Sequence, residues 1–466
     1  MRKFAVFKKT QIYIHFSCHL VMNIIFFDSP SLRTHLLPFT FTRPVADLRV
    51  GILTVKEKFE TYFNEYLKNT VKNSTENTNH SEIEPHTFSF LTQDYLQEKF
   101  PIYFEGSKSE NIKDANLYIN GAVLPTLEFF EKLNALPLET AIFSETGNEL
   151  IAFKTFTQFK SIEKFYDFAL KVAKQKTEKI KIQFLTRTWD IFRANKQEIE
   201  KDFDLITTGR KSQVIADKHT VLYNEERIFI EHGADIKCAI LNAEKGAIYI
   251  GKNAIVEEGA IIRGSFALGE GSTINTGSNM RGDTTIGKFC KIGGEVSNCV
   301  FFGYSNKGHD GFLGNAVIGE WCNLGAATNC SNLKNNYGTV RIWNYAEENY
   351  EKTDLQFCGL LMGDHSKSGI CTMFNTATVV GTGANVFGEG FPPKFIPSFA
   401  WGNGSGSGVG NRNKFVTTHL DALFKTAERM MSRRNVAFTE TERKIMKHVF
   451  EDTNSYRFWE SNPMFS

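Results

Sequence analysis

One histidine of this sequence has neighbours that suit proton transfer. His309 lies in a glycine-rich stretch, residues 303–315, and amide side chains follow it at Asn323, Asn329 and Asn332. A neutral imidazole can accept a proton near pH 7, and side-chain amides can orient a polar substrate. A lone histidine is more often a surface or structural residue, so the glycines and amides around this one decide the interpretation. We predict that His309 is a general base.

The elements that position this stretch follow from an apolar ladder with a period of six. Its members are Ile250, Val256, Ile262, Leu268, Ile274, Met280, Ile286 and Ile292. Helices repeat apolar positions about every 3.6 residues and half-buried strands about every 2, so this period fits neither. It is typical of a parallel β-helix, in which each rung stacks on the equivalent rung of the next coil. The register is interrupted at 294–317 and 331–358, where we expect loops or irregular coils that leave the β-helix.

The chain before the ladder predicts a different domain. In residues 22–220, apolar strands at 23–27, 87–91, 116–119, 141–143 and 150–153 alternate with helices at 54–66, 127–133, 162–172 and 188–206. This alternation indicates an α/β domain with a largely parallel sheet.

Three further segments complete the predicted organisation. Residues 221–400 are assigned to the β-helix, and 401–466 to a glycine-rich linker followed by two helices, the second opened by a capping box from Thr439 to Glu442. Residues 1–21 are interpreted as an extension ahead of a start at Met22, or as a disordered segment.

Composition excludes several classes of protein. The 466 residues are 41% apolar and 23% charged, which is typical of a globular chain with two or three domains. Lys and Arg number 54 against 52 acidic residues, and no stretch reaches the ~18 apolar residues that cross a bilayer. Neither nucleic acid nor a membrane is therefore an expected partner. The 8 cysteines form no CxxC pair, so we expect free thiols, no metal site and a cytoplasmic location.

Residues 228–390 resemble the acetyltransferase domain of a known enzyme family. The matching motifs are Lys-Gly-His309, Gly314-Asn315, Ile318-Gly, Asn323-Leu-Gly-Ala326-Ala-Thr and Asn332. The family is the bifunctional N-acetylglucosamine-1-phosphate uridyltransferase/glucosamine-1-phosphate acetyltransferase family. The resemblance implies a left-handed β-helix that forms a homotrimer, with acetyl-CoA bound between neighbouring coils as co-substrate. It also implies that His309 deprotonates a sugar amine, which then attacks the thioester.

The same resemblance implies roles for other residues. Asn323 would contact the sugar phosphate, and Asn332 would orient acetyl-CoA or the amine. Backbone at Ala326 and Ala327 would bind the cofactor, with the Ala326 N–H facing the thioester. Two cations are candidates to neutralise the phosphate, and the sequence does not choose between them: Lys334 and Arg341.

Two positions depart from the family pattern. Phe312 stands where the family usually has an aromatic hydroxyl, and Leu268 stands near a family arginine. Acceptor specificity is therefore less well determined by the resemblance than acyl transfer is.

Residues 37–58 resemble the nucleotidyltransferase domain of the same family more faintly. Nucleotidyltransferases hold a triphosphate on a glycine-rich loop after the first strand, but the corresponding residues 28–33 contain no glycine. Ala122 occupies the place of a metal-binding aspartate, and Val45 the place of a lysine. Three arginines remain as candidate nucleotide contacts: Arg33, Arg43 and Arg49. The domain has either altered or lost its catalysis, or is a working enzyme with rearranged ligands that requires Mg²⁺.

Three hypotheses of function follow. The first is an acetyl-CoA-dependent N-acetyltransferase of an amino-sugar 1-phosphate similar to glucosamine-1-phosphate, with formation of a UDP-sugar as a second activity of a multifunctional enzyme of UDP-N-acetylglucosamine biosynthesis. The second is a sugar-1-phosphate nucleotidyltransferase, using UTP or dTTP, whose β-helix only oligomerises. The third is a non-catalytic protein that binds a nucleotide sugar.

Overall fold

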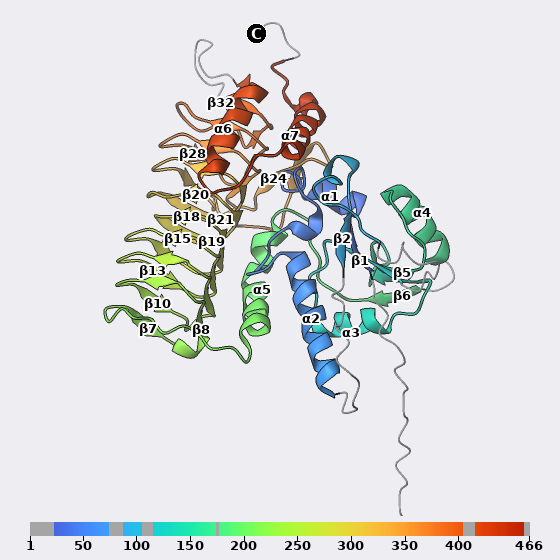
Figure 1. Ribbon diagram of the computed structural model, residues 1–466. Helices are drawn as coiled ribbons and strands as arrows, with labels where there is room; N and C mark the ends of the chain where they lie inside the picture. Colours follow the sequence, from blue (N-terminus) through green and yellow to red (C-terminus); the bar gives the residue numbers. More distant parts are fainter. Residues whose placement is uncertain (1–22, 74–86, 105–114, 174–176, 404–414, 461–466) are drawn as a thin grey trace, which may run out of the picture.

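The computed structural model describes residues 23–73, 87–104, 115–173, 177–403 and 415–460. It shows an α/β domain beside a parallel β-helix of about 10 coils, with two helices against the upper coils (Figure 1). The predicted fold class is therefore confirmed. Residues 1–21 and most of the glycine-rich linker lie outside the described residues.

The sheet of the α/β domain is mixed. Its strand order is β2-β1-β3-β5-β4-β6, with β1 at Asn23–Phe27, β2 at Phe88–Leu91, β3 at Asn116–Asn120, β4 at Thr140–Ser144, β5 at Leu150–Thr155 and β6 at Thr177–Ile180. The predicted parallel pairing holds around β1 and between β4 and β6, but β5 is antiparallel to β3 and β4. The connection between β4 and β5 is too short for a crossover helix, so the two strands form a hairpin.

Helices cover both faces of this sheet. They are α1 at Pro30–His35, α2 at Val55–Asn73, α3 at Leu127–Ala135, α4 at Ile162–Ala173 and α5 at Asp190–Thr207. Alternate residues of β1 point to opposite sides: Phe26 belongs to the core shared with α2, whereas Phe27 packs against Phe165 of α4. The four predicted helices are present. The short elements α1 and β6 were not predicted, because their sequences show no clear periodicity.

The β-helix has three faces. We define face A by β8 (Ile228–Ile230), β11 (Ile248–Ile250), β14 (Phe266–Leu268), β17 (Thr284–Lys288), β26 (Leu360–Met362), β29 (Thr378–Val380) and β31 (Phe395–Ile396). Face B comprises β9 (Asp235–Ile236), β12 (Ile255–Val256), β15 (Thr273–Ile274), β18 (Lys291–Ile292), β20 (Asn306–Lys307), β22 (Asn323–Leu324), β27 (Lys367–Ser368), β30 (Asn385–Val386) and β32 (Ala400–Gly402), with β33 (Val416–Thr417) added antiparallel. Face C comprises β7 (Val221–Tyr223), β10 (Ile240–Asn242), β13 (Ile261–Arg263), β16 (Asn279–Met280), β23 (Asn329–Cys330) and β28 (Met373–Phe374).

The predicted ladder forms the interior of these coils. All eight rungs are at most 1% exposed, and equivalent rungs pair in register, as Ile250 does with Leu268 and Leu268 with Ile286. The six-residue period therefore corresponds to one strand and one corner.

The first predicted interruption is wrong. Residues 294–317 stay within the β-helix, because β19 (Glu295–Gly303) and β21 (Phe312–Glu320) each run along face C and bend onto face A without a break. The second prediction is confirmed: between 331 and 358 the chain leaves the coils and forms a hairpin of β24 (Arg341–Asn344) and β25 (Asn349–Lys352). Both strands pair with each other and not with a coil.

The α/β domain is docked on face A. Outward residues of face A, among them Val300, Val317 and Leu361, belong to the same apolar cluster as the core of the α/β domain. α5 runs beside the lower coils, where Ile199 and Phe203 pack on Phe229 (Figure 1). The outer side of face A is therefore covered by the α/β domain.

The C-terminal helices close the upper coils. They are α6, Leu420–Ser432, and α7, Glu440–Asp452, and the predicted capping box of α7 is present at Thr439 and Glu442. In the described part of the chain, no helix combines the length and apolar character that crossing a membrane requires.

Candidate active site

His309 lies at the corner between faces B and C. β20 ends on face B at Lys307 and β21 begins on face C at Phe312, so residues 308–311, which we call the His309 loop, form the turn. The His309 side chain is exposed. In a three-sided coil this corner is opposite face A, so the imidazole stands on the side of the β-helix away from the α/β domain.

The coil below supports the His309 loop closely. A Cβ atom on Gly293 would lie 2.6 Å from the Gly308 carbonyl oxygen, and one on Gly294 would lie 2.8 Å from that of Gly311. Asn275, two coils below the loop, also reaches it, since its side chain donates to the Gly308 carbonyl at 2.7 Å. Two adjacent glycines therefore let the loop rest directly on the corner beneath it.

The coil above completes the support. Asn329 Oδ1 accepts from the Phe312 N–H at 2.8 Å, and a Cβ on Gly311 would meet the Thr328 carbonyl oxygen at 2.2 Å. The corner preceding Thr328 contains Ala326 and Ala327, the latter with a φ of 55°. The structure thus brings the His309 loop against the coil on which sequence reasoning placed the cofactor contacts.

Asn332 lies on the same coil and is oriented by a second amide. Its Nδ2 donates to Asn315 Oδ1 at 2.8 Å. A Cβ on Gly314 would lie 2.6 Å from Asn332 Nδ2 and 2.7 Å from the Phe312 ring, so only glycine leaves room for both side chains. The Phe312 ring and the Asn332 amide thus lie on the same side of Gly314.

Asn323 is exposed on face B, in a column of polar residues. Its neighbours in register are Asn306 on the coil below and Lys367 on the coil above. Strands in a sheet are about 4.8 Å apart, so these side chains are adjacent. The Lys367 ammonium group donates to the His365 carbonyl at 2.9 Å, and burial lowers the pKa of Lys367. Asn323 therefore has a cationic neighbour that sequence reasoning missed.

The two predicted phosphate cations lie elsewhere. Lys334 and Arg341 belong to the segment that leaves the coils, where Lys334 Nζ donates to the Thr339 carbonyl at 3.1 Å and Arg341 to that of Tyr350 at 2.9 Å. These contacts direct both side chains to their own segment rather than to the His309 loop. Leu268 is fully buried as an inward rung, so it cannot contact a ligand.

The three arginines proposed for a nucleotide have internal partners. Arg33 donates to the Thr40 carbonyl at 3.0 Å and to the Tyr95 hydroxyl at 2.7 Å. Arg43 is 4% exposed and forms an ion pair with Asp364 of the β-helix, and its Nη2 is 3.4 Å from Glu320. Arg49 donates to the Phe302 carbonyl and pairs with Glu57 at 3.5 Å. Arg43 and Arg49 thus connect the two domains.

In the loop after β1, two serine hydroxyls donate to a carboxylate. Glu149 accepts from the Ser29 hydroxyl at 3.0 Å and from the Ser31 hydroxyl at 2.8 Å, so these donors are already used within the protein. Asp28 Oδ1 accepts from Val45 N–H at 2.8 Å, and Asn120 Oδ1 accepts from Ala122 N–H at 3.0 Å. Burial raises the pKa of Asp28. Within the described ranges no group of three or more His, Cys, Asp or Glu side chains could hold a metal ion, and the carboxylates of Asp28 and Glu149 already accept hydrogen bonds from the protein.

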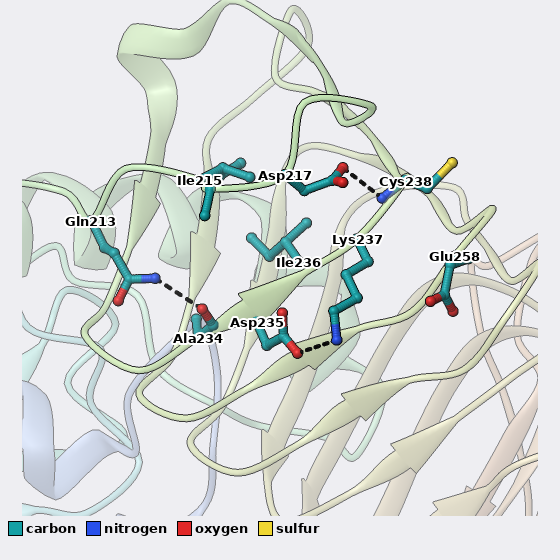
Figure 2. A pocket seen from close by; sticks show the side chains of 10 residues that line it. Gln213, Ile215, Asp217, Ala234, Asp235, Ile236, Lys237, Cys238 and Glu258 are labelled. Carbon is teal, nitrogen blue, oxygen red and sulfur yellow. Dashed lines mark hydrogen bonds and ion pairs between the residues drawn. The ribbon is translucent and has the colours of Figure 1, made fainter.

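The described residues also form cavities away from His309. One, of about 440 Å³, is at the lower end of the β-helix, where Gln213 donates to the Ala234 carbonyl and Asp235 pairs with Lys237 (Figure 2). Four coil steps of about 4.8 Å separate it from the His309 loop. Another, of about 260 Å³, lies between the domains beside Arg49, Tyr304 and Trp321. In both cavities the charged side chains named here have partners within the protein: Asp235 pairs with Lys237, and Arg49 pairs with Glu57.

The N-terminal part of the chain is similar to a known family. Residues 24–211 match the sequence model of a family described as "Sugar nucleotidyl transferase". No curated protein sequence matches the chain significantly.

Similar solved structures include three proteins. The polySia-specific acetyltransferase NeuO has 15% identity and a TM-score of 0.25, covering 48% of this chain and 97% of its own. The UDP-N-acetylglucosamine acyltransferase of Arabidopsis has 14% identity and a TM-score of 0.24, covering 54% and 97%. A hexapeptide transferase family protein of Anaplasma phagocytophilum has 18% identity and a TM-score of 0.14, covering 46% and 91%. The β-helix itself is established by the strand register. The match of residues 24–211 supports a transferase whose N-terminal domain is similar to sugar nucleotidyltransferases.

Proposed function

We propose that this chain is an acetyl-CoA-dependent N-acetyltransferase of an amino-sugar 1-phosphate, with His309 as general base. One observation carries the proposal: an exposed histidine stands on a loop fastened to the coils below and above it, beside the coil of Ala326 and Asn332. Catalysis needs a base held in one place, and rigid scaffolds that present short loops supply it.

The proposed reaction follows from these positions. The imidazole of His309 takes a proton from the sugar ammonium or amine, and the nitrogen lone pair attacks the thioester carbonyl. The Ala326 N–H stabilises the oxyanion of the tetrahedral intermediate, which then expels the thiolate of coenzyme A. Asn332 orients the reacting groups. Asn323 binds the phosphate, and Lys367, its neighbour in register, is the cation that neutralises it. Lys334 and Arg341 are bound within the segment that leaves the coils.

A homotrimer is part of this proposal. Apolar side chains recur on the two open faces, with Ile255 of face B 41% exposed and Val221, Ile240 and Ile261 of face C 43%, 37% and 38% exposed. Exposed apolar rows of this kind mark contact surfaces between proteins. Packing of faces B and C between three copies would bury them and bring the His309 corner next to a neighbouring coil, where acetyl-CoA would bind.

The test is release of free thiol from acetyl-CoA with glucosamine-1-phosphate, comparing the wild type with His309→Ala. A general base contributes about 10²- to 10⁴-fold, so the variant should lose activity by that factor. His232→Ala is the matched control, because His232 is also exposed and lies at a lower corner of the same β-helix. Equal rates in the wild type and His309→Ala would refute the role of His309, and no turnover by the wild type with amino-sugar phosphates would refute the acetyltransferase.

A second candidate activity is nucleotidyl transfer to a sugar 1-phosphate, as the match of residues 24–211 favours. Around β1, residues 28–33 contain no glycine to hold a triphosphate, and Asp28 and Glu149 already accept hydrogen bonds from Val45, Ser29 and Ser31. Pyrophosphate release from UTP or dTTP with Mg²⁺ and a sugar phosphate decides the question. Nucleotide-sugar binding without either reaction would instead support the non-catalytic hypothesis.

A further inference from the structure

A lysine is buried inside the β-helix immediately before the His309 loop. The inward column of face B runs through Ile236, Val256, Ile274, Ile292, Lys307, Leu324, Ser368 and Val386. Lys307 is 1% exposed and is the single charged member of that column. A charge in an apolar interior is costly unless polar groups surround it, so its partners indicate its role.

Those partners are three carbonyl groups at one corner. Lys307 Nζ donates to the carbonyl oxygens of Gly293 at 3.0 Å, His309 at 3.0 Å and Asp310 at 3.2 Å. Two of the three belong to the His309 loop, and the third belongs to the coil beneath it. An ammonium group has three protons and no acceptor, so its hydrogen-bonding capacity is fully used.

We propose that Lys307 is a positioning residue, whose ammonium group ties the backbone of the His309 loop to the coil below from inside the β-helix. The bonds from Asn275 and to Asn329 fix the two ends of the turn, at Gly308 and Phe312. Lys307 holds the residues between them, including the backbone of His309 itself. The link to catalysis rests on the proposed acetyltransferase function, whereas the mechanical role does not.

The titration of Lys307 adds a testable consequence. Burial lowers the pKa of Lys307 to about 8. Above that pH the amine keeps two protons, so one of the three carbonyls loses its donor and the loop loosens. Asp310 is the carboxylate that acts on this group, and the thiol of Cys299 is the other titratable group near it.

The experiment compares Lys307→Met with Ile274→Met, a substitution of similar size two coils away in the same column. Hydrogen exchange of peptides covering residues 306–316 should accelerate at least about ten-fold in Lys307→Met and stay at the wild-type rate in Ile274→Met. The thermal unfolding midpoint of both variants shows whether the fold persists. This readout needs no enzymatic activity, so it decides the mechanical role even if the wild type transfers no acetyl group.

The catalytic consequence is measured in the acetyl-transfer assay. Misplacement of a base by about 1 Å costs up to about 10²-fold, so kcat should fall 10- to 100-fold in Lys307→Met while KM changes less than about two-fold. The wild type should lose kcat near pH 8, and the variant should lack that limb. Wild-type exchange rates in the loop of Lys307→Met, or an unchanged kcat and pH profile, would overturn the inference.

Discussion

The ion pair between Arg43 and Asp364 decides whether Arg43 connects the domains or binds a nucleotide. Asp364 is 3% exposed; it accepts from Arg43, from the Thr42 hydroxyl at 2.5 Å and from the Glu320 N–H at 2.8 Å. We consider the substitution Asp364→Leu, which removes the carboxylate and leaves the Arg43 guanidinium buried. Its remaining partners are then Glu320, at 3.4 Å, and Asp47, at 3.9 Å.

The expected loss of folding stability follows from the burial of this ion pair. Removing one partner of a buried ion pair costs about 3–5 kcal/mol, because the other charge is left uncompensated. Since Glu320 remains near Arg43, we expect about 3 kcal/mol for Asp364→Leu. The double variant Arg43→Met/Asp364→Leu leaves neither charge unpaired, so it should be more stable than the sum of the single variants by about 2 kcal/mol or more.

Urea unfolding of the wild type, both single variants and the double variant measures this coupling, with the m value checked for each. Binding of UTP with Mg²⁺ is measured on Arg43→Met in parallel. Costs that add within about 0.5 kcal/mol would refute the buried pair. Loss of UTP binding in a folded Arg43→Met variant would show that Arg43 is a nucleotide contact after all.

Two further outcomes are expected. Gly294→Ala should lower acetyl transfer much more than Gly277→Ala. Both glycines have a positive φ, at 75° and 66°, but only a Cβ at Gly294 would meet the His309 loop and Lys307. Equal effects of the two substitutions in the thiol-release assay would contradict this. Burial raises the pKa of Asp47 from 3.8 to about 6, so the folded state holds this proton more tightly than the unfolded state and stability falls as pH rises from about 4 to about 6. Asp47→Asn should therefore unfold at a higher temperature than the wild type at pH 8 and lose this advantage toward pH 4, and a difference that does not change with pH would contradict it.

The period of the ladder predicted most of the β-helix because each rung depends only on its neighbours in adjacent coils. All eight rungs are buried where the six-residue register places them. The prediction failed at 294–317, where β19 and β21 absorb a change of coil length by bending through a corner. A strand that turns a corner keeps its backbone pairing while its apolar spacing changes, so a fixed period cannot follow it.

Individual side chains were harder to place than elements. Arg43 had the sequence context of a phosphate contact, yet its partners Glu320 and Asp364 come from the β-helix, far along the chain, and only the docked structure brings them together. Lys307 was missed as well, although a signal existed. Once face B is traced in register, a lysine falls in an inward column whose neighbours are Ile292 and Leu324, and such a position calls for a polar partner.

The docking geometry separates the two candidate activities in space. The α/β domain shares its core with face A, through residues such as Val317 and Leu361, whereas the His309 loop occupies the corner between faces B and C. The apolar interior of the coils lies between them and is filled by buried rungs such as Ile292 and Ile318. A sugar phosphate acetylated at the corner would therefore reach the carboxyl edge of the α/β sheet only through solvent. The two reactions, if the chain performs both, are coupled by diffusion and by a common scaffold, not by a passage through the protein.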